Sequence, residues 1–421
     1  MSDPETASSS ELLEEKVPVD AHISRVSGSA VQNADRADRS PVIRQEKRQP
    51  DGNSAYTVSE NGITVCAYRD MLKFIFSGND LSVDPFVFGR IRRPRLLFSV
   101  NGEIHDALAS GYVPENHGGT LTFTDDEKDF CAKTGITVSG KHRCIAISFT
   151  ARGHFSRICP MLCFEPCLAP TSKRAAHPAY CDIMITAEYL SDRSLILYSV
   201  KDHSGGEGLC IAVSFECRGG NEEYLLTRSG LGLMYGERDV EALVTADFPD
   251  TVYSVGEPFC AVKKESECPG GKYAANILIT VGKGRGDAVG SMLAVRQEYR
   301  RRGAYGRFSA AAARSAAERA AACGKRYDGR YTGLMLARTL LNRNAGFCDS
   351  PHGIGELYRH GISGDLPIFC LDVTDTLTDG SPAAVTAAGF IAAHKYLSLC
   401  GIRTDLVIFY ESDGDYGGKQ R

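Results

Sequence analysis

The chain has 421 residues, of which 43% are hydrophobic and 24% charged, and its formal net charge at pH 7 is −4. These values fit a folded protein with room for two or three domains, and the small negative charge excludes an electrostatic case for binding nucleic acid. No apolar run approaches the ~20 residues of a membrane span, and the polar, acidic first residues do not form a signal peptide, so we expect a cytoplasmic protein.

Fifteen cysteines are scattered along the chain and never form a Cys-x-x-Cys pair, so we expect no disulfide framework. The densest group is Cys159, Cys163 and Cys167, which would share one strand face with Met161 and Glu165. A zinc site requires paired ligands at tight turns and a fourth partner. We therefore predict buried small hydrophobes here, with no metal and no cofactor.

Residues 1–54 are polar and poor in aromatic residues, so they cannot bury enough apolar surface to offset the entropy of ordering, and we predict disorder. Residues 55–284 carry short apolar runs with turn residues between them. About eleven such runs without helical periodicity predict a β-rich (α+β) fold based on a large antiparallel sandwich. The runs are 63–68, 73–78, 95–100, 121–124, 135–139, 144–151, 158–166, 181–189, 194–200, 209–216 and 274–282.

The period changes to that of a helix after Gly284, and we predict linker helices within 285–345, at 286–303, 308–324 and 332–346. The arginines at 300–302 are interpreted as a solvated helix end. The apolar residues of the first helix are Val289, Met292, Leu293 and Val295, and those expected to face inward in the third are Leu334, Leu336, Leu340 and Leu341.

Residues 346–421 are predicted to form a partial C-terminal domain around the stretch 353–372, in which a glycine-rich polar loop leads into an apolar strand. A helix at 381–401 follows, with Ser381 as N-cap, Pro382 at its first position and Gly401 after its end. An apolar strand at 404–410 then completes a βαβ unit.

Two segments resemble a known family. Glu165, the Leu-Ala-Pro at 168–170, the Ala-His-Pro-Ala-Tyr at 176–180 and the Thr-Ala-Glu-Tyr at 186–189 stand in the order found in the sandwich domain of glycosyltransferase family 36. That domain occurs in glycoside hydrolase family 94 phosphorylases and in cyclic β-1,2-glucan synthases. The Gly-Ile-Ser-Gly-Asp-Leu-Pro-Ile at 361–368 is similar to a region that follows the sandwich in those synthases.

The resemblance implies a β-super-sandwich of carbohydrate-binding type at 55–284, followed by linker helices and the start of a helical domain. Family phosphorylases use a carboxylic acid in a Gly-Phe-Arg-Asp-type motif within an (α/α)6 barrel. This chain has Ser363 and Gly364 where Arg and Asp would stand, so no catalytic residue is carried over. The residues after 284 are also too few for twelve helices, which need roughly 180. We therefore expect one piece of a longer, synthase-like protein.

Three functions remain open from the sequence. The first is an accessory module that binds a β-glucan oligosaccharide and docks to a catalytic partner chain. Its predicted sugar contacts lie in the polar loop, because carboxylate and guanidinium groups beside an aromatic ring suit a sugar, and tyrosine must replace the absent tryptophan. These candidate carbohydrate-binding residues are Tyr358, Arg359, His360, Ser363 and Asp365.

The second function is an active glucoside phosphorylase or transglycosylase, for which Glu165, Glu188 and Asp365 are the carboxylates in motif context. The third is a phosphotransferase, because Asp372 follows an apolar strand as a phosphoryl-accepting aspartate would. The two glutamates are expected to form structural pairs within the sandwich. His177, between Ala176 and Pro178, is expected to fix a loop by bonding to the backbone.

Overall fold

The computed structural model describes residues 55–68, 71–76, 79–82, 94–108, 112–115, 119–127, 129–170, 184–201, 207–217, 219–220, 222–228, 237–336, 355–362, 366, 368–373 and 381–410. The chain divides into two units, residues 1–48 and 49–421, and every described residue belongs to the second unit. The predicted disorder of residues 1–54 concerns residues outside the described part. The domain boundaries at 284 and 345 stay predictions.

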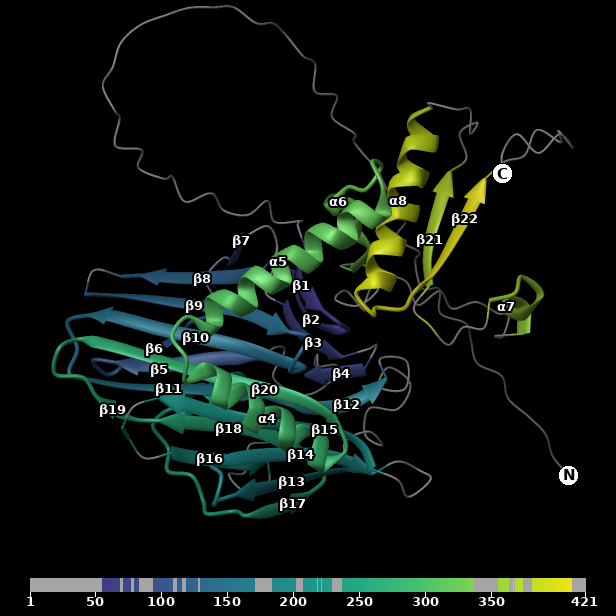
Figure 1. Cartoon of the computed structure of the whole chain (residues 1–421). Coiled ribbons are helices and arrows are strands. Elements are labelled where there is room, and N and C mark those ends of the chain that lie inside the picture. Colours follow the sequence, from purple (N-terminus) through teal and green to yellow (C-terminus); the bar gives the residue numbers. More distant parts are fainter. Residues whose placement is uncertain are drawn as a thin grey trace, which may run out of the picture. The chain divides into compact units, whose positions relative to one another are not determined.

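Most of the described strands belong to two large antiparallel sheets, so the predicted β-rich sandwich is confirmed (Figure 1). Nine described strands form the larger sheet and run, in order across it, as β17 (Tyr253–Val255), β13 (Ile185–Leu190), β14 (Leu195–Lys201), β15 (Glu207–Cys217), β20 (Lys272–Lys283), β10 (Cys144–Gly153), β9 (Phe130–Ser139), β8 (Thr120–Asp126) and β7 (Tyr112–Glu115).

The second large sheet and a smaller one complete the β-rich part of the described chain. The second sheet consists of β16 (Glu222–Thr227), β18 (Pro258–Lys264), β11 (Arg157–Phe164), β5 (Arg95–Val100) and β6 (Glu103–Asp106), with β19 (Ser266–Glu267) paired to β11. The smaller sheet consists of β1 (Ala55–Glu60), β2 (Ile63–Tyr68), β3 (Met71–Phe76), β4 (Asn79–Ser82) and β12 (Pro166–Pro170).

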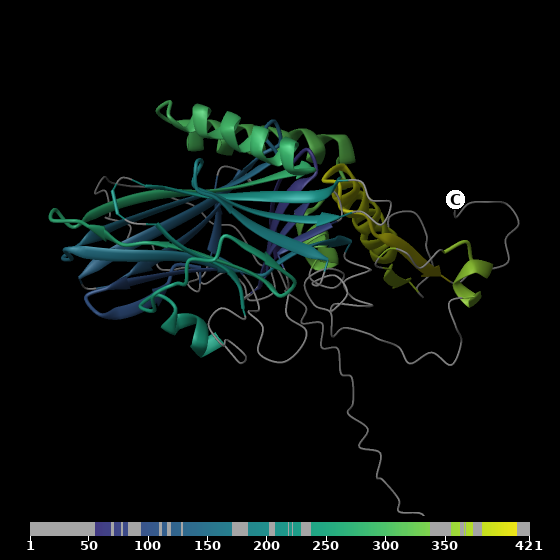
Figure 2. The same ribbon diagram turned by 90° about the horizontal axis from the view of Figure 1, so that it is seen from below.

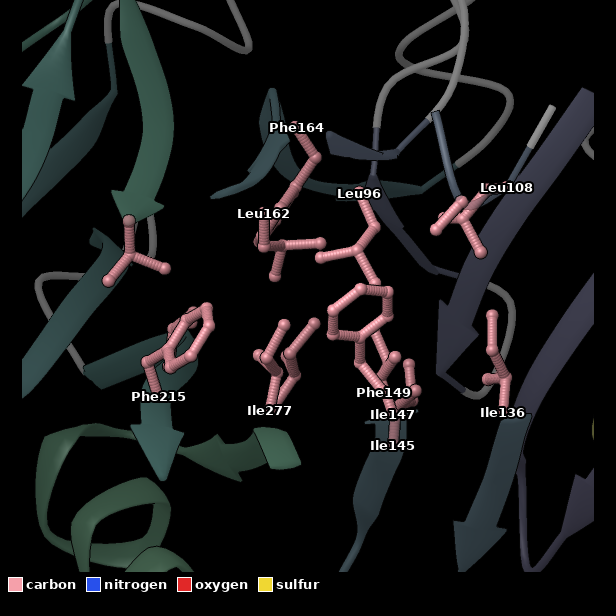
Figure 3. Packing of buried hydrophobic residues seen from close by; sticks show 14 of the residues in the cluster. Leu96, Leu108, Ile136, Ile145, Ile147, Phe149, Leu162, Phe164, Phe215 and Ile277 are labelled. Carbon is pink, nitrogen blue, oxygen red and sulfur yellow. The ribbon is translucent and has the colours of Figure 1, made fainter. Parts of the chain in front are cut away.

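The main hydrophobic core lies between the inner faces of the two large sheets. Leu96 and Leu162 of the second sheet point toward Phe149 and Ile277 of the larger one (Figure 3). All four side chains are fully buried, as the alternating pattern of the strands predicts. The hydroxyl of Tyr198 adds a polar link across this core, donating a 2.8 Å hydrogen bond to the carbonyl oxygen of a residue on β18.

Helices cover the outer face of the larger sheet, along which they lie in Figure 2. In α4 (Arg285–Tyr299), Val289, Met292 and Val295 pack on β10, β15 and β20, while Leu293 is exposed. The next helix, α5 (Ala304–Cys323), continues over β9 and reaches β1. The outer face of the larger sheet is thus covered, as the inner face is. The outward-facing hydrophobic residues of β10 and β15 are alanine and cysteine, whose small side chains let a helix pack closely.

The C-terminal elements form the predicted βαβ unit. β21 (Ile368–Val373) and β22 (Asp405–Tyr410) pair in parallel, and α8 (Pro382–Leu399) lies between them in sequence. The N-cap prediction is confirmed, because the Ser381 hydroxyl accepts a 3.1 Å hydrogen bond from the backbone N–H of Ala384. Two short helices, α3 (Glu237–Ala242) and α7 (Gly355–Arg359), complete the described elements, together with α6 (Gly329–Leu336).

A second hydrophobic cluster joins α6, α8 and β21 to the smaller sheet through Cys66 and Ile75. Leu336 is buried in this cluster, as expected, but Leu334 is 41% exposed and does not face inward, which corrects that expectation. The reason is that α6 presents Met335 and Leu336 to α8, and this places Leu334 on the opposite side of a short helix. Leu340 and Leu341 lie outside the described residues.

Candidate functional site

A polar pocket of about 340 Å³ opens at one end of the sandwich, where elements distant in sequence meet. The turn between β13 and β14, the end of β15, the start of β16, the end of β18 and the last turn of α4 all contribute to its wall. We call it the rim pocket and define it by Glu216, Glu222, Lys264, Asn276, Arg296 and Arg300, which line it.

Strand register places the polar groups of the rim pocket in two facing pairs. Glu216 of β15 stands opposite Asn276 of β20, and Glu222 of β16 stands opposite Lys264 of β18. Directly opposed residues on antiparallel strands have Cβ atoms about 5 Å apart, close enough to act on one ligand. The pocket thus presents a carboxylate beside an amide and a carboxylate beside an ammonium group.

Arg296 of α4 is the structural anchor of this pocket. Its guanidinium donates hydrogen bonds to the carboxylate of Glu216 and the hydroxyl of Ser214. It also donates to the carbonyl oxygen of Arg193 at 2.5 Å and to that of Ser194 at 2.9 Å. Because these bonds occupy all three guanidinium nitrogens, Arg296 holds the pocket wall in place and leaves ligand contacts to its neighbours.

Asn276 and Lys264 have the hydrogen-bonding capacity that Arg296 lacks. Within the part of the chain that the structure describes, neither side chain makes a hydrogen bond, and both are half-buried. An amide supplies two donors and an acceptor, and an ammonium group supplies three donors. The pocket can therefore hold a ligand that carries several neighbouring hydroxyl groups.

Burial changes the proton affinity of Glu222. Burial, with a smaller contribution from the nearby Glu216, raises the pKa of Glu222 above the usual range of a glutamate, although Lys264 and Arg296 oppose the shift. The hydroxyl of Tyr189 also lies 3.4 Å from a carboxylate oxygen of Glu222. A buried carboxyl group with a raised pKa beside other charged groups is a recurring feature of sites that move protons.

A pair of stacked tyrosines lies beside the pocket. The rings of Tyr189 on β13 and Tyr224 on β16 have centroids 3.6 Å apart and planes 18° apart, and both residues are half-buried. Through the contact of Tyr189 with Glu222, this aromatic pair borders the polar groups. An aromatic surface next to hydrogen-bonding groups suits the apolar face and hydroxyl edge of a sugar ring.

The predicted loop site is only partly described. Tyr358 and Arg359 belong to α7, His360 follows it, and all three side chains are exposed. Gly361, with φ of +72°, ends the helix in a Schellman arrangement, in which its N–H and that of the next residue bond back to carbonyl oxygens of α7. Ser363 and Asp365 lie outside the described residues, so the loop site stays a prediction.

Both glutamates considered as catalytic acids form ion pairs, as expected. Glu165 is buried and pairs with Arg228. Glu188 is bound by both terminal nitrogens of Arg285, at 2.6 and 3.0 Å, which ties β13 to the start of α4. Asp372 is exposed near the end of β21, and His177 lies outside the described residues.

The cysteine group separates into two clusters. Cys159 and Cys163 pack with Met161 in an apolar cluster, and burial raises the pKa of Cys159 to about 11, which keeps the thiol protonated. Their predicted role as buried small hydrophobes is confirmed. Cys167 is also buried but lies on β12 in another sheet, because the strand is interrupted at Glu165, so the single shared face that we predicted is wrong for Cys167.

Two further observations concern the described residues only. No three His, Cys, Asp or Glu side chains lie close enough together among them to hold a metal ion. None of the described helices combines the length and apolar character needed to cross a bilayer.

Comparisons with known proteins give no relative by sequence: no family model matches the chain, and no curated protein matches it. Among solved structures, it is similar to a bacterial glucoamylase complexed with acarbose, at 8% identity and a TM-score of 0.41, over 69% of this chain and 41% of that one. It is also similar to a family GH92 α-mannosidase from Bacteroides thetaiotaomicron, at 9% identity and a TM-score of 0.36, over 67% of this chain and 38% of that one.

A third similar structure is heparinase III, at 9% identity and a TM-score of 0.35, over 56% of this chain and 37% of that one. The chain thus spans about two fifths of the length of the solved structures named here. Similarity at this level assigns neither an activity nor a substrate to this chain.

Proposed function

We propose that this chain binds carbohydrate at the rim pocket and that its ligand is a β-glucan oligosaccharide. The proposal makes the chain an accessory piece of a protein resembling a cyclic β-1,2-glucan synthase or a glucoside phosphorylase, docked to a catalytic partner chain. The sequence motifs of the glycosyltransferase family 36 sandwich support the choice of ligand. The named structural neighbours include carbohydrate-active enzymes, and the proposal does not depend on them.

One observation carries the proposal: the opposed pairs Glu216–Asn276 and Glu222–Lys264 line a single pocket. Vicinal hydroxyls of a sugar can donate to a carboxylate while they accept from an amide or an ammonium group, so each pair matches one edge of a pyranose ring. The clamp by Arg296 fixes the wall before a ligand arrives, which lowers the entropy lost on binding.

A volume of about 340 Å³ lies at the small end of the range of ligand sites. It suits one or two sugar units, with the remainder of an oligosaccharide lying along the surface. The stacked rings of Tyr189 and Tyr224 lie at the border of the pocket and offer the next unit an aromatic contact. We therefore expect longer glucans to bind more tightly than disaccharides.

An active glucoside phosphorylase or transglycosylase is the second candidate function. It is favoured by the presence of Glu222, whose pKa is raised, in the same pocket as the ion-paired Glu216. Glycoside hydrolysis uses a pair of carboxyl groups, and the group that acts as general acid has a raised pKa. This alternative requires that the chain consume or release phosphate in the presence of sophorose-type substrates. It also requires that Glu222→Gln abolish this activity.

The test is calorimetric titration of the whole chain with β-1,2-, β-1,3- and β-1,4-linked gluco-oligosaccharides of two to six units. We expect binding that strengthens with length and is weakened about tenfold or more by Asn276→Ala, because each lost hydrogen bond to a buried group costs about 1–3 kcal/mol. The control is Arg157→Ala, which removes an exposed side chain that pairs with Glu265 and Glu267 and does not line the pocket.

The same titration separates the rim pocket from the predicted loop. If the loop binds the sugar, Arg359→Ala and Asp365→Ala must abolish binding. If the rim pocket binds it, both variants must leave the affinity unchanged. Absence of binding to all the gluco-oligosaccharides, in the wild-type chain, contradicts the proposal.

A further inference from the structure

A second cleft, unrelated to the rim pocket, lies among the helices that follow the sandwich. It has a volume of about 420 Å³ and is bounded by the turn after α5, the first turn of α6 and the first turn of α8. Figure 1 shows α6 beside α8, and the two helices are in contact. We call it the tyrosine cleft and define it by Lys325, Arg326, Tyr327, Asp328, Arg330 and Tyr331, which line it.

Packing against α8 fixes the two aromatic rings of this cleft. Tyr327 is stacked on Tyr396, with ring centroids 4.7 Å apart and planes 22° apart, and Tyr331 lies 4.7 Å from Phe390. Close approach of Tyr331 requires a glycine on α8, because a Cβ atom at Gly389 would stand 2.3 Å from the ring. The rings are therefore preformed walls of the cleft.

The charge of the cleft is positive although the chain as a whole has a net charge of −4. Arg330 binds the carboxylate of Asp328 through Nε at 2.9 Å and Nη2 at 2.6 Å, so these two charges offset each other. Lys325 and Arg326 are exposed and make no hydrogen bond or ion pair within the described part of the chain. Among the described residues, these two positive charges at the cleft have no paired carboxylate.

Helix geometry adds to this positive potential. Ala384 and Val385, in the first turn of α8, line the cleft, so the N-terminal end of an 18-residue helix faces it. The aligned peptide dipoles of a helix place a partial positive charge at that end. Burial also raises the pKa of Tyr327, which keeps its phenol group neutral and able to donate a hydrogen bond.

We propose that the tyrosine cleft binds a phosphomonoester carried on a ring of about the size of a monosaccharide. Lys325 and Arg326 receive the phosphate, while Tyr331 contacts the ring. A volume of about 420 Å³ accommodates a sugar phosphate, and charge-assisted bonds to phosphate are stronger than bonds to neutral hydroxyls. This site does not rest on the proposed binding of glucan at the rim pocket, with which it shares no residue.

The experiment titrates the whole chain with glucose 1-phosphate, glucose 6-phosphate, inorganic phosphate and glucose, followed by calorimetry at low salt. We expect at least one phosphomonoester to bind about tenfold or more tightly than inorganic phosphate, and glucose alone not to compete, since both the charge and the ring contribute. Comparison of the two esters distinguishes a phosphate at the anomeric position from one on the primary hydroxyl.

Variants at exposed positions keep the test interpretable. The double variant Lys325→Ala/Arg326→Ala is expected to lose about tenfold or more in affinity for the ester. The matched control Arg301→Ala/Arg302→Ala removes the same charge from the exposed turn between α4 and α5 and is expected to leave affinity unchanged. Tyr331→Leu is expected to reduce the preference for the ester over inorganic phosphate, because it removes the aromatic contact with the ring and keeps an apolar side chain against Phe390.

Three results would overturn the proposal. The first is that neither ester binds at 10 mM, a concentration about a hundredfold above the affinity of a typical metabolite site. The second is an equal loss of affinity in the two double variants. The third is equal affinity for the ester and for inorganic phosphate. None of these depends on glucan binding, which Asn276→Ala tests separately.

Discussion

Arg296 on α4 donates a hydrogen bond to the carboxylate of Glu216 on β15, across 80 residues of sequence. The same guanidinium reaches the carbonyl oxygens of Arg193 and Ser194 in the turn before β14. One side chain thus holds a helix, a strand and a turn together at the end of the sandwich. The geometry of the rim pocket depends on this clamp.

Replacing Arg296 by alanine should therefore affect both stability and binding. The variant leaves two carbonyl oxygens without their donor and removes the ion-pair partner of the half-buried Glu216, and we expect the free energy of unfolding to fall by about 2 kcal/mol. Urea denaturation at pH 7 measures this change. Arg193→Ala is the control: only the backbone of Arg193 accepts from Arg296, and its exposed side chain pairs with Asp192, so a loss under about 0.5 kcal/mol is expected.

Glu222 should reduce stability as the pH rises. Burial raises its pKa in the folded chain above the value of about 4.3 found in unfolded chains, so the folded state binds the proton more tightly. The unfavourable contribution begins near that unfolded value and is complete above the folded one. Glu222→Gln should consequently be relatively more stable at pH 7 than at pH 4, as measured by thermal unfolding across this interval. A difference between the two chains that does not vary with pH contradicts the assignment.

Glu298 should make the protein more stable as the pH rises, which is opposite to the effect of Glu222. The ring of His142 lies 2.7 Å from its carboxylate, and this hydrogen bond is the main cause of its lowered pKa, with Lys141 contributing. Its stabilisation is present above the usual glutamate value and is lost as the pH falls through the lowered one. Glu298→Gln should cost about 1 kcal/mol at neutral pH, and progressively less as the pH falls through the lowered pKa of Glu298. Equal losses at neutral and at low pH would show that the ion pair does not contribute.

The alternation of apolar and polar residues located several strands of the sandwich core. Ile145, Ile147 and Phe149 of the predicted run 144–151 all face the core, because side chains two residues apart share a face. Strands without that pattern were missed. β6 is short and polar at a sheet edge, and β18 is a continuous buried run in which no alternation is visible.

The rim pocket could not be predicted in the same way. Its residues come from elements spread between Arg193 and Arg300, and only the strand register brings Glu216 opposite Asn276. The arginines at 300–302 are exposed, in agreement with their interpretation as a solvated helix end, and the half-buried Arg296 was not part of that interpretation. The sequence contained a weak signal of this pocket. On strands of the larger sheet, the outward-facing positions are apolar over most of the strand and become polar toward its end.

Packing in the interior of the sandwich contributes strongly to the free energy of unfolding. Phe149 is fully buried, and its ring centroid lies 5.2 Å from that of Phe98 in the opposite sheet. Phe149→Ala removes this contact and leaves a cavity, so we expect a loss of about 3–5 kcal/mol in the free energy of unfolding. The neighbouring Thr150 is exposed, and Thr150→Ala should change stability by less than about 0.5 kcal/mol. Denaturant titration of both variants provides the comparison.

The central claim is that the end of the sandwich, and not the loop around Arg359, receives a sugar. Its most direct test is one calorimetric titration series with β-1,2-linked gluco-oligosaccharides on three chains: wild type, Asn276→Ala and Arg359→Ala. We predict that the wild type and Arg359→Ala bind tightly, and that Asn276→Ala loses about tenfold or more in affinity. Undiminished binding by Asn276→Ala together with loss in Arg359→Ala would contradict it.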